Sequence, residues 1–446
     1  MSERFDEHVA NAVLGTDTLW GGDVMNPSGL GRFIADSWFS DAPLPVAYTH
    51  ATAARVRESG GVSAKEPDRA AIEAYLAAVD VRGAIGALAT EAKGLSGLRG
   101  RYVAGLALCF DVMWDLAMEI LGKGAPVPYE RCVLASTGLP PTPSDPAAKR
   151  RQVQELLARA GHPSAGDTGL LAAVDAWRGE RYVPMACVRS QGGAYIAQYR
   201  SLSERSLRPH LPRELADVPM DNIEFLPIKD AWFSGSMNYL GRRRRPGGQP
   251  EYEASYEINA SLQITVPEFE QLVTHEVVPG HVTTFAFLQD LFWRGKVGFE
   301  ASVLTMNTRA ATLFEGIANN AILIAHGVTE IEQIPDDDLK IGLLLALLQD
   351  DAKNQASYLT WQERAAEADI APVLRRDFLI SEERAGKFAG PWGKHPLLGR
   401  MYLPCYRAGT DLVAELRRKH APGKLLPVLY GCAGLVDCTT IEQALL

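Results

Sequence analysis

Residues 267–281 read PEFEQLVTHEVVPGH, a helix-forming stretch that runs directly into a helix-breaking pair. Pro267 suits the first turn of a helix, and the apolar residues that follow it recur at helical spacing. Pro279 has no N–H to donate to the carbonyl of His275, so a regular helix should end or kink there. Gly280 then permits backbone conformations that most residues avoid. We therefore predict a helix that is interrupted at Pro279–Gly280, with a change of chain direction.

The same stretch carries two histidines and a glutamate, His275, Glu276 and His281. In the H-E-x-x-H arrangement the histidines are four residues apart and share a metal ion from one helical face. Here they are six residues apart, which on an unbroken helix would separate them by about 120° around the axis. A bend at Pro279–Gly280 would turn His281 back towards His275. The alternative is that the helix ends at Val278 and that His281 caps another element.

A third candidate ligand, Glu315, lies in the segment 301–327, which we predict to be one long helix ended by Gly327. A catalytic zinc ion usually takes three protein ligands and keeps one position open. A carboxylate in the apolar centre of a helix is costly unless it is paired or metal-bound, and pairing with Arg309 is the alternative to metal binding. Its neighbours on the helix face are small or polar, which leaves room for an ion and for outer contacts: Ala311, Ala318 and Asn319.

The sequence H-E-V-V-P-G-H at 275–281, followed by F-E-G at 314–316, resembles the "domain of unknown function 885" family. These are zinc-peptidase-like proteins of the gluzincin type, with the pattern H-E-x-x-P-G-H and a later E-G. The resemblance covers roughly residues 222–412. It implies a mainly α-helical, zinc-metallopeptidase-like fold, zinc held by His275, His281 and Glu315, and Glu276 as the general base.

The chain departs from the family pattern at four positions outside the three ligands. A second histidine often follows the first motif, and a tryptophan often follows E-G. The family's later P-G-Q-A-like segment is matched only approximately by LPCYRAGTDL at 403–412. The four departures are Val282, Ile317, Cys405 in a glycine position, and Thr410 where a tyrosine is common. They leave the metal ligands intact and bear on substrate specificity.

The rest of the chain predicts a mainly α fold with a small antiparallel β-sheet beside the active site. Residues 66–125 have the pattern of packed helices, 136–148 that of a loop, and 222–265 that of short strands, with helices again from residue 267. We divide the chain into a helical N-terminal region, 1–215, and a metal-binding catalytic region, 216–446, which form one integrated unit.

Several further residues are candidates for contacts with a substrate. Tyr402, Tyr406 and Arg407, with His395 nearby in sequence, could stabilise an oxyanion, and packing is the alternative role for each. The strand at 252–264 could bind an extended peptide along an exposed edge, with Tyr256 and Asn259 beside the substrate. Arg407, or the arginine run 242–245, could bind a substrate carboxylate; the run is otherwise a solvated loop. Asp350 and Asp351 are interpreted as a solvated helix end, with a contact near the site as the alternative.

These observations give three functional hypotheses. The leading one is a zinc-dependent hydrolase of a peptide or amide bond, with Glu276, Tyr406 and Arg407 as catalytic residues. The second keeps the zinc but uses it for hydrolysis or a lyase step on a small amino-acid-derived metabolite. The third is a non-catalytic, helical binding protein stapled by zinc, against which the retention of Glu276 argues.

Composition narrows the class of partner. The 446 residues carry a net charge of −9, which disfavours nucleic acid. The most apolar run, 341–348, is too short to span a membrane, and the N-terminal residues lack the apolar core of a signal peptide. We therefore expect a cytoplasmic protein with a small peptide or amide substrate, no nucleic-acid partner and no membrane partner. Six scattered cysteines favour free thiols.

Overall fold

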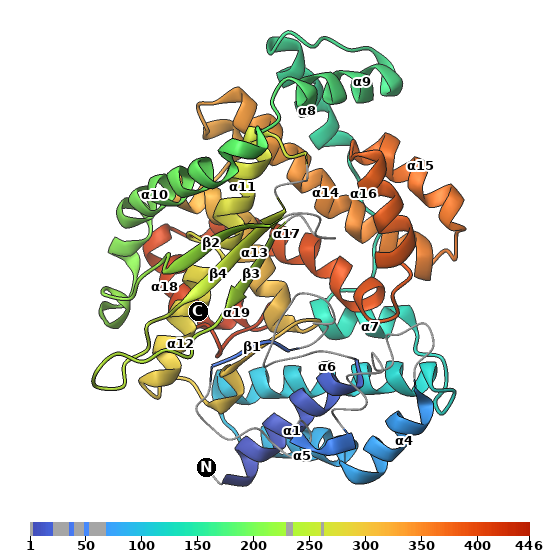
Figure 1. Cartoon of the computed structure of the whole chain (residues 1–446), viewed down its shortest axis with the longest axis vertical. Coiled ribbons are helices and arrows are strands. Elements are labelled where there is room, and N and C mark those ends of the chain that lie inside the picture. The colour runs from blue at the N-terminus through green and yellow to red at the C-terminus, as the bar shows by residue number, and fades with distance from the viewer. Residues whose placement is uncertain (1–2, 21–34, 40–48, 53–67, 229–234, 260–262) are drawn as a thin grey trace.

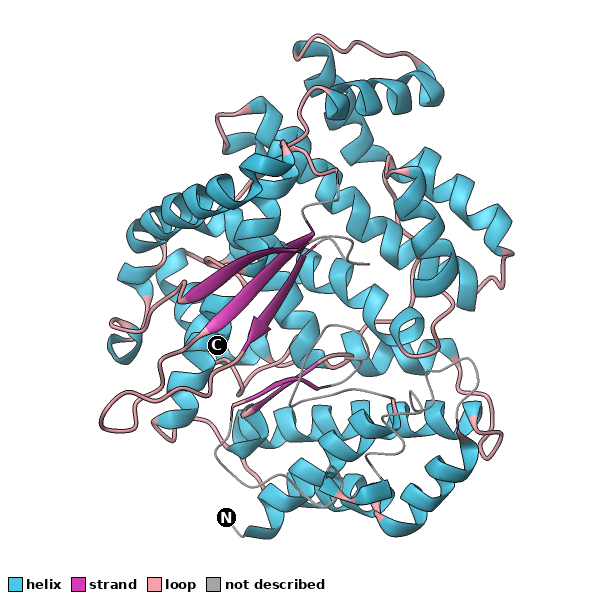
Figure 2. Ribbon diagram, in the orientation of Figure 1, coloured by secondary structure: helices cyan, strands magenta, loops and turns pink. Residues whose placement is uncertain are grey.

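The computed structural model describes the chain apart from residues 1–2, 21–34, 40–48, 53–67, 229–234 and 260–262. It is mainly α-helical with a small mixed sheet, which confirms the predicted fold class at this level (Figures 1 and 2). The helices of the N-terminal part are α1 (Glu3–Leu19), α4 (Arg69–Ala78), α5 (Val81–Ala92), α6 (Gly97–Ile120), α7 (Tyr129–Thr137), α8 (Ala147–Arg159), α9 (Gly166–Gly179) and α10 (Val188–Ser206).

The predicted helices of residues 66–125 correspond to α4, α5 and α6, and aspartate caps fix the first two. The Asp68 side chain accepts the N–H of Ala71, and the Asp80 side chain accepts the N–H of Gly83. The predicted loop lies between α7 and α8. The C-terminal helices are α11 (Val266–Glu276), α12 (His281–Trp293), α13 (Arg309–His326), α14 (Asp337–Trp361), α15 (Glu367–Phe378), α16 (Glu382–Lys387), α17 (Leu403–Lys419), α18 (Pro422–Gly431) and α19 (Ile441–Ala444).

The three-stranded sheet is mixed, not antiparallel as predicted. Its strands are β2 (Ile223–Ile228), β3 (Gly235–Tyr239) and β4 (Ala254–Asn259), in the spatial order β2-β4-β3. β4 pairs parallel with β2 and antiparallel with β3, so that Tyr256 has Phe225 on one side and Met237 on the other. The prediction failed because β4 inserts between the two earlier strands, and two chain reversals leave β2 and β4 pointing the same way.

The central position of β4 overturns a second expectation. Both edges of β4 are hydrogen-bonded to neighbouring strands, so this strand cannot bind an extended peptide through a free edge. Its side chains alternate, with Ala254, Tyr256 and Ile258 buried. Residues 260–262 of the predicted strand lie outside the described part of the chain.

A two-stranded antiparallel sheet shortens the predicted helix of residues 301–327. β5 (Val303–Thr305) pairs with β1 (Ala35–Trp38), a partner more than 250 positions away in sequence. α13 therefore begins only at Arg309, where the Thr308 side chain caps the N–H of Ala311 at 3.2 Å. It ends as predicted at Gly327, whose φ of 68° is left-handed.

Two large hydrophobic cores and a small cluster of Ala311, Tyr402 and Cys405 lie within the described part of the chain. The main core contains residues from Phe5 to Leu445, so regions 1–215 and 216–446 both contribute to it. A second core is shared by α8, α9, α14, α15 and α16, with Trp177 and Phe378 among its large side chains. The long helix α14 contributes to both and lies near the middle of Figure 1. The six cysteines are all unpaired, as predicted.

Glycines allow α13 and α17 to cross at very short range. A Cβ atom on Gly316 would overlap the carbonyl oxygen of Gly409, and a Cβ atom on Gly409 would overlap the carbonyl oxygen of Thr312. Only hydrogen atoms fit between the two backbones at this crossing. The glycine of the F-E-G sequence thus lets α17 lie directly against the helix that carries Glu315.

Candidate metal centre

The interruption predicted at Pro279–Gly280 is present. α11 begins with a reciprocal cap between Thr265 and Glu268 and ends at Glu276. Residues 277–280 form a tight turn with a cis Val278–Pro279 peptide bond, and α12 begins at His281.

The turn brings the two histidines together. Their rings lie 4.7 Å apart, centroid to centroid, and perpendicular. Glu315 joins them from α13, with ligand atoms of all three side chains within 4.8 Å of one another. Arg309, the alternative partner of Glu315, instead donates to the carbonyl of Ala135 at 3.1 Å.

The separations fit a bound ion better than direct hydrogen bonds. His275 Nε2 lies 3.6 Å from Glu315 Oε2, and His281 Nε2 lies 3.7 Å from Glu315 Oε1. Both distances exceed a normal N–H···O bond. A tetrahedral zinc ion with ligands at its usual bond lengths separates neighbouring donor atoms by about 3.4 Å. Two imidazoles and one carboxylate are also a donor set that suits a catalytic zinc ion.

Burial keeps both histidines neutral near pH 7. It lowers the pKa of His281 to about 4. It also lowers the pKa of His275 well below the usual value, and repulsion from Lys353, and from His281 where that ring is protonated, adds to this effect. A neutral imidazole is the form that binds a metal ion. The two rings are therefore ready to bind without first losing a proton.

Outer contacts fix the orientation of His275. The amide nitrogen of Asn319 donates to Asp350 Oδ2 and to Thr410 Oγ1, each at 2.8 Å. The amide oxygen therefore faces His275 Nδ1, also at 2.8 Å, and accepts a hydrogen bond from its N–H. This leaves the lone pair of His275 Nε2 directed at Glu315. His281 lacks such a contact: among the described residues its buried Nδ1 has no hydrogen-bond partner.

The interpretation of Asp350 and Asp351 as a solvated helix end is wrong. Both are buried, at 6% and 3% exposure. Asp350 binds Lys353 Nζ at 3.0 Å, and Asp351 binds Lys149 Nζ at 2.8 Å. Burial raises the pKa of Asp351 to about 6. The sequence misled because α8 supplies Lys149 from more than 200 residues away.

One tyrosine of the candidate set, Tyr402, contacts the candidate ligand Glu315, and a second, Tyr406, packs against Tyr402. The Tyr402 hydroxyl donates to Glu315 Oε1 at 2.5 Å, and the Tyr402 ring meets the Tyr406 ring edge-on at 5.2 Å. Burial, with the charges of Glu315 and Asp350, raises the pKa of Tyr406 well above its ordinary value. Tyr406 therefore stays protonated and can donate a hydrogen bond, as its predicted role requires.

Lys353, which the sequence did not single out, completes a closed series of contacts. Its ammonium lies 3.2 Å from the centre of the Tyr406 ring and 3.0 Å from Asp350. We call this series the contact circuit; its members in order are Glu315, His275, Asn319, Asp350, Lys353, Tyr406 and Tyr402, which returns to Glu315. Lys353 was missed because nothing in QDDAKNQ marks which helical neighbours it meets.

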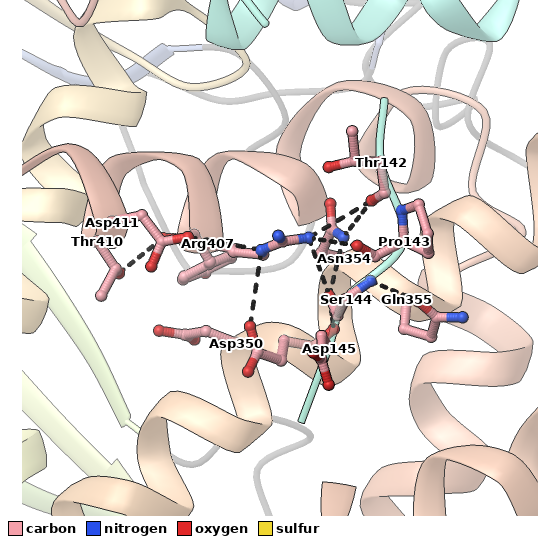
Figure 3. Close-up of polar contacts among 12 residues, drawn as sticks. Thr142, Pro143, Ser144, Asp145, Asp350, Asn354, Gln355, Arg407, Thr410 and Asp411 are labelled. Atoms are coloured by element: carbon pink, nitrogen blue, oxygen red, sulfur yellow. Dashed lines mark hydrogen bonds and ion pairs between the residues drawn. The ribbon is translucent and has the colours of Figure 1, made fainter. Parts of the chain in front are cut away.

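Arg407, predicted as a catalytic residue, is engaged elsewhere (Figure 3). Its guanidinium donates to the carbonyl oxygens of Thr142 and Pro143 and to the hydroxyl of Ser144. Its Nε lies 3.5 Å from Asp411 and 3.7 Å from Asp351. In the described part of the chain Arg407 therefore fastens the loop that precedes α8, and these contacts do not support an oxyanion role.

Three further candidates from the sequence are Glu276, Tyr256 and the arginine run 242–245. Glu276 is half-buried beside His275. Burial, and then the charge of Glu276, raises the pKa of the Tyr256 hydroxyl well above its ordinary value. The arginine run 242–245 lies in the loop between β3 and β4, where Glu253 accepts the backbone N–H groups of Arg242 and Arg243 at 2.7 Å.

Comparison with known proteins identifies a shared fold but no function. No protein-family model and no curated protein matches the chain. A structure described as a "putative lipoprotein" from Colwellia psychrerythraea matches with a TM-score of 0.52 and 14% identity, over 81% of this chain and 66% of that one. A "putative lipoprotein of unknown function" from Shewanella oneidensis matches with a TM-score of 0.48 and 13% identity, over 91% of this chain and 79% of that one.

The Colwellia structure bears on the expected location. That neighbour is described as a lipoprotein, which contradicts the prediction of a cytoplasmic protein, and we withdraw that prediction. The sequence had suggested it only through the absence of a recognisable signal. Within the described residues, no helix combines the length and the apolar character that crossing a bilayer requires.

Proposed function

We propose that this protein is a zinc-dependent hydrolase of peptide or amide bonds. The convergence of His275, His281 and Glu315 within 4.8 Å, with Glu276 beside the first ligand, carries the proposal. Zinc bound there would supply Lewis-acid activation of water and of the scissile carbonyl. The metallopeptidase-like character of the fold is part of the same proposal.

The protein's own side chains have distinct roles in this reaction. Glu276 accepts the proton of the attacking water and passes it to the leaving nitrogen, since its half-buried carboxylate adjoins the ligand His275. The Tyr406 hydroxyl donates a hydrogen bond to the oxygen that becomes negative. Tyr402 holds Glu315 in place through its 2.5 Å hydrogen bond.

Metal content tests the proposed ligands. We expect about one zinc ion per chain in wild-type protein purified without chelators, and its loss in both His281→Ala and Glu315→Ala. His162→Ala is a matched control, because His162 pairs with Glu180 and lies outside the metal centre. Plasma mass spectrometry gives the ratio. A wild-type protein that stays metal-free after incubation with zinc would overturn the proposal.

Glu276→Gln distinguishes catalysis from a structural zinc ion. The variant should keep its zinc and lose hydrolysis by at least about 100-fold, because the amide cannot accept a proton. Assays would use a panel of peptides and acylated amino acids. Full activity in zinc-loaded Glu276→Gln would exclude catalysis through this residue.

A further inference from the structure

Within the described part of the chain, one cation from outside the candidate ligands belongs to the contact circuit, and that cation is buried. Among the described residues, Lys353 is 7% exposed and its ammonium touches Tyr406 and Asp350, both members of the contact circuit. The two alternatives considered from the sequence are committed elsewhere. Arg407 binds the loop at 142–144, and the run 242–245 lies on the loop between β3 and β4.

The contacts of Lys353 leave it able to bind another anion. An ammonium group has three N–H donors. In the described structure these meet one carboxylate oxygen, Asp350 Oδ1, and the face of the Tyr406 ring. The other oxygen of Asp350, Oδ2, accepts a hydrogen bond from the Asn319 amide. The negative charge of Asp350 is therefore divided between two donors, Lys353 and Asn319. A buried lysine is costly without anionic partners, and a second carboxylate would complete its coordination.

The position of Lys353 determines which part of a substrate it could meet. The Tyr406 hydroxyl, which packs beside Tyr402 and senses the charge of Glu315, is the group proposed to meet the reacting carbonyl, and Lys353 lies against the ring of the same residue. The Lys353 ammonium is thus separated from the proposed position of the scissile bond by about the size of one tyrosine ring. At that separation it matches a charged substrate group that lies one residue away from the scissile bond. In a peptide, the nearest such anion is the carboxylate of the residue that supplies the leaving nitrogen.

We propose that Lys353 binds the free terminal carboxylate of the substrate, so that the enzyme releases a single C-terminal amino acid. This inference rests on the proposed hydrolase function and specifies its substrate class. The preferred substrates are then dipeptides, N-acylated amino acids or longer peptides with a free C-terminus. Peptide amides lack the charge and are poor substrates.

Equilibrium binding tests the inference without relying on turnover. The protein is the zinc-loaded full chain with Glu276→Gln, and the probes are acetyl-alanyl-alanine, its C-terminal amide, and acetyl-alanyl-aspartic acid amide. We expect the free acid to bind at least about tenfold more tightly than either amide, since a desolvated lysine–carboxylate contact discriminates on that scale. Equal affinity for acid and amide would overturn the inference. Preference for the aspartyl amide would also overturn it, because the carboxylate would then belong to a side chain.

Variants assign the preference to Lys353. Adding Lys353→Met should weaken binding of the free acid about tenfold or more and change binding of the amide less than about twofold. Lys149→Met is the matched control: it removes a lysine that pairs with the adjacent Asp351, and it should leave both affinities unchanged. Asp350→Asn combined with Lys353→Met removes the whole ion pair while keeping an acceptor for Asn319, so it guards against a folding defect from an unpaired Asp350. If this double variant retains the preference for the acid, Lys353 is not its origin.

Hydrolysis by the wild-type protein separates the two proposals. Binding preference for the acid without hydrolysis of either probe would remove the proposed function and keep the carboxylate site. Equal hydrolysis of the acid and the amide would keep the proposed function and remove the role of Lys353.

Discussion

At the residue scale, Asn319 links the proposed metal ligand His275 to the rest of the protein. It stands one helical turn after Glu315 and places an uncharged amide between His275 and the buried Asp350. A carboxylate in direct contact with His275 would attract the proton on Nδ1 more strongly than an amide does. The amide of Asn319 fixes the tautomer of His275, and its own hydrogen bond to Asp350 polarises the amide. The affinity for zinc should therefore depend on a residue that does not touch the ion.

Replacement of Asn319 by leucine should weaken zinc binding about 10- to 100-fold, because His275 loses the acceptor that orients it. Competition with a fluorescent chelator measures the affinity. Asn354→Leu is the matched control, because Asn354 makes its hydrogen bonds to Thr142 and Ser144. It should lower stability while leaving zinc affinity within about twofold. Equal zinc affinity in Asn319→Leu and wild type would show that Asn319 does not orient the ligand.

The two tyrosines should respond differently to loss of the hydroxyl. Tyr406→Phe should retain zinc and lower kcat about 100-fold, because the reaction loses a donor to the developing charge. Tyr402→Phe should chiefly lower zinc affinity, about tenfold, because Glu315 loses its hydrogen bond. Parallel measurement of kcat and metal content distinguishes the two. The assignment of roles fails if the two variants give the same pattern.

The sequence reveals a site residue where the neighbouring residues already mark it, and misses one whose surroundings come from distant elements. His275, Glu276 and His281 lie within one short segment whose Pro-Gly pair explains their spacing, and Glu315 stands out as a carboxylate in an apolar helix. Asp350 and Lys353 carry no such mark. They are packed against side chains from α13 and α17, which are distant in sequence.

At the element scale, the crossing of α13 and α17 determines whether the contact circuit can close. Gly316 and Gly409 allow the two backbones to touch, and this contact brings Tyr402 and Tyr406 to Glu315. The helical periodicity of each segment predicts the two helices but not their separation. The topology of the sheets was similarly out of reach, since β1 pairs with a strand far along the chain and β4 enters between two earlier strands.

Gly316→Ala should destabilise the protein by about 1–3 kcal/mol and lower zinc affinity, because the new methyl group pushes α17 away from Glu315. Gly193→Ala is the matched control. Gly193 lies in α10 with open space where a Cβ atom would sit, so alanine there should stabilise the helix by about 0.5–1 kcal/mol. Urea unfolding gives the free energies. A Gly316→Ala protein as stable as wild type would contradict the tight crossing.

At the scale of the whole molecule, buried titratable groups give stability a defined dependence on pH. Burial lowers the pKa of His395 to about 4 from 6.5 and raises that of Asp351 to about 6 from 3.8. As pH falls from 6.5 to 4, the unfolded chain binds a proton at His395 that the folded chain does not, so stability is lost. For Asp351 the folded chain binds the proton first, so stability is lost as pH rises from 3.8 to 6.

His395→Asn and Asp351→Asn should therefore change the pH profile in opposite directions. The difference in unfolding free energy between wild type and His395→Asn should increase with pH, on the order of 3 kcal/mol across its window, and become constant above it. The difference for Asp351→Asn should decrease with pH over a similar range. Urea unfolding of metal-free protein at several pH values gives both curves. If the unfolding free energies of wild type and variant run parallel across the pH range, burial does not shift the pKa values of His395 and Asp351 as described.

The contact circuit also bears on how this protein could diversify. The proposed metal ligands come from α11, α12 and α13, whereas Lys353 comes from α14, Tyr406 from α17 and Tyr402 from the position just before α17. A mutation at Lys353 can therefore alter the proposed choice of substrate while the proposed metal ligands are inherited unchanged. A lineage that carried the same histidines and glutamate with a neutral residue at position 353 would keep the proposed metal centre and lose the proposed preference for a free carboxylate.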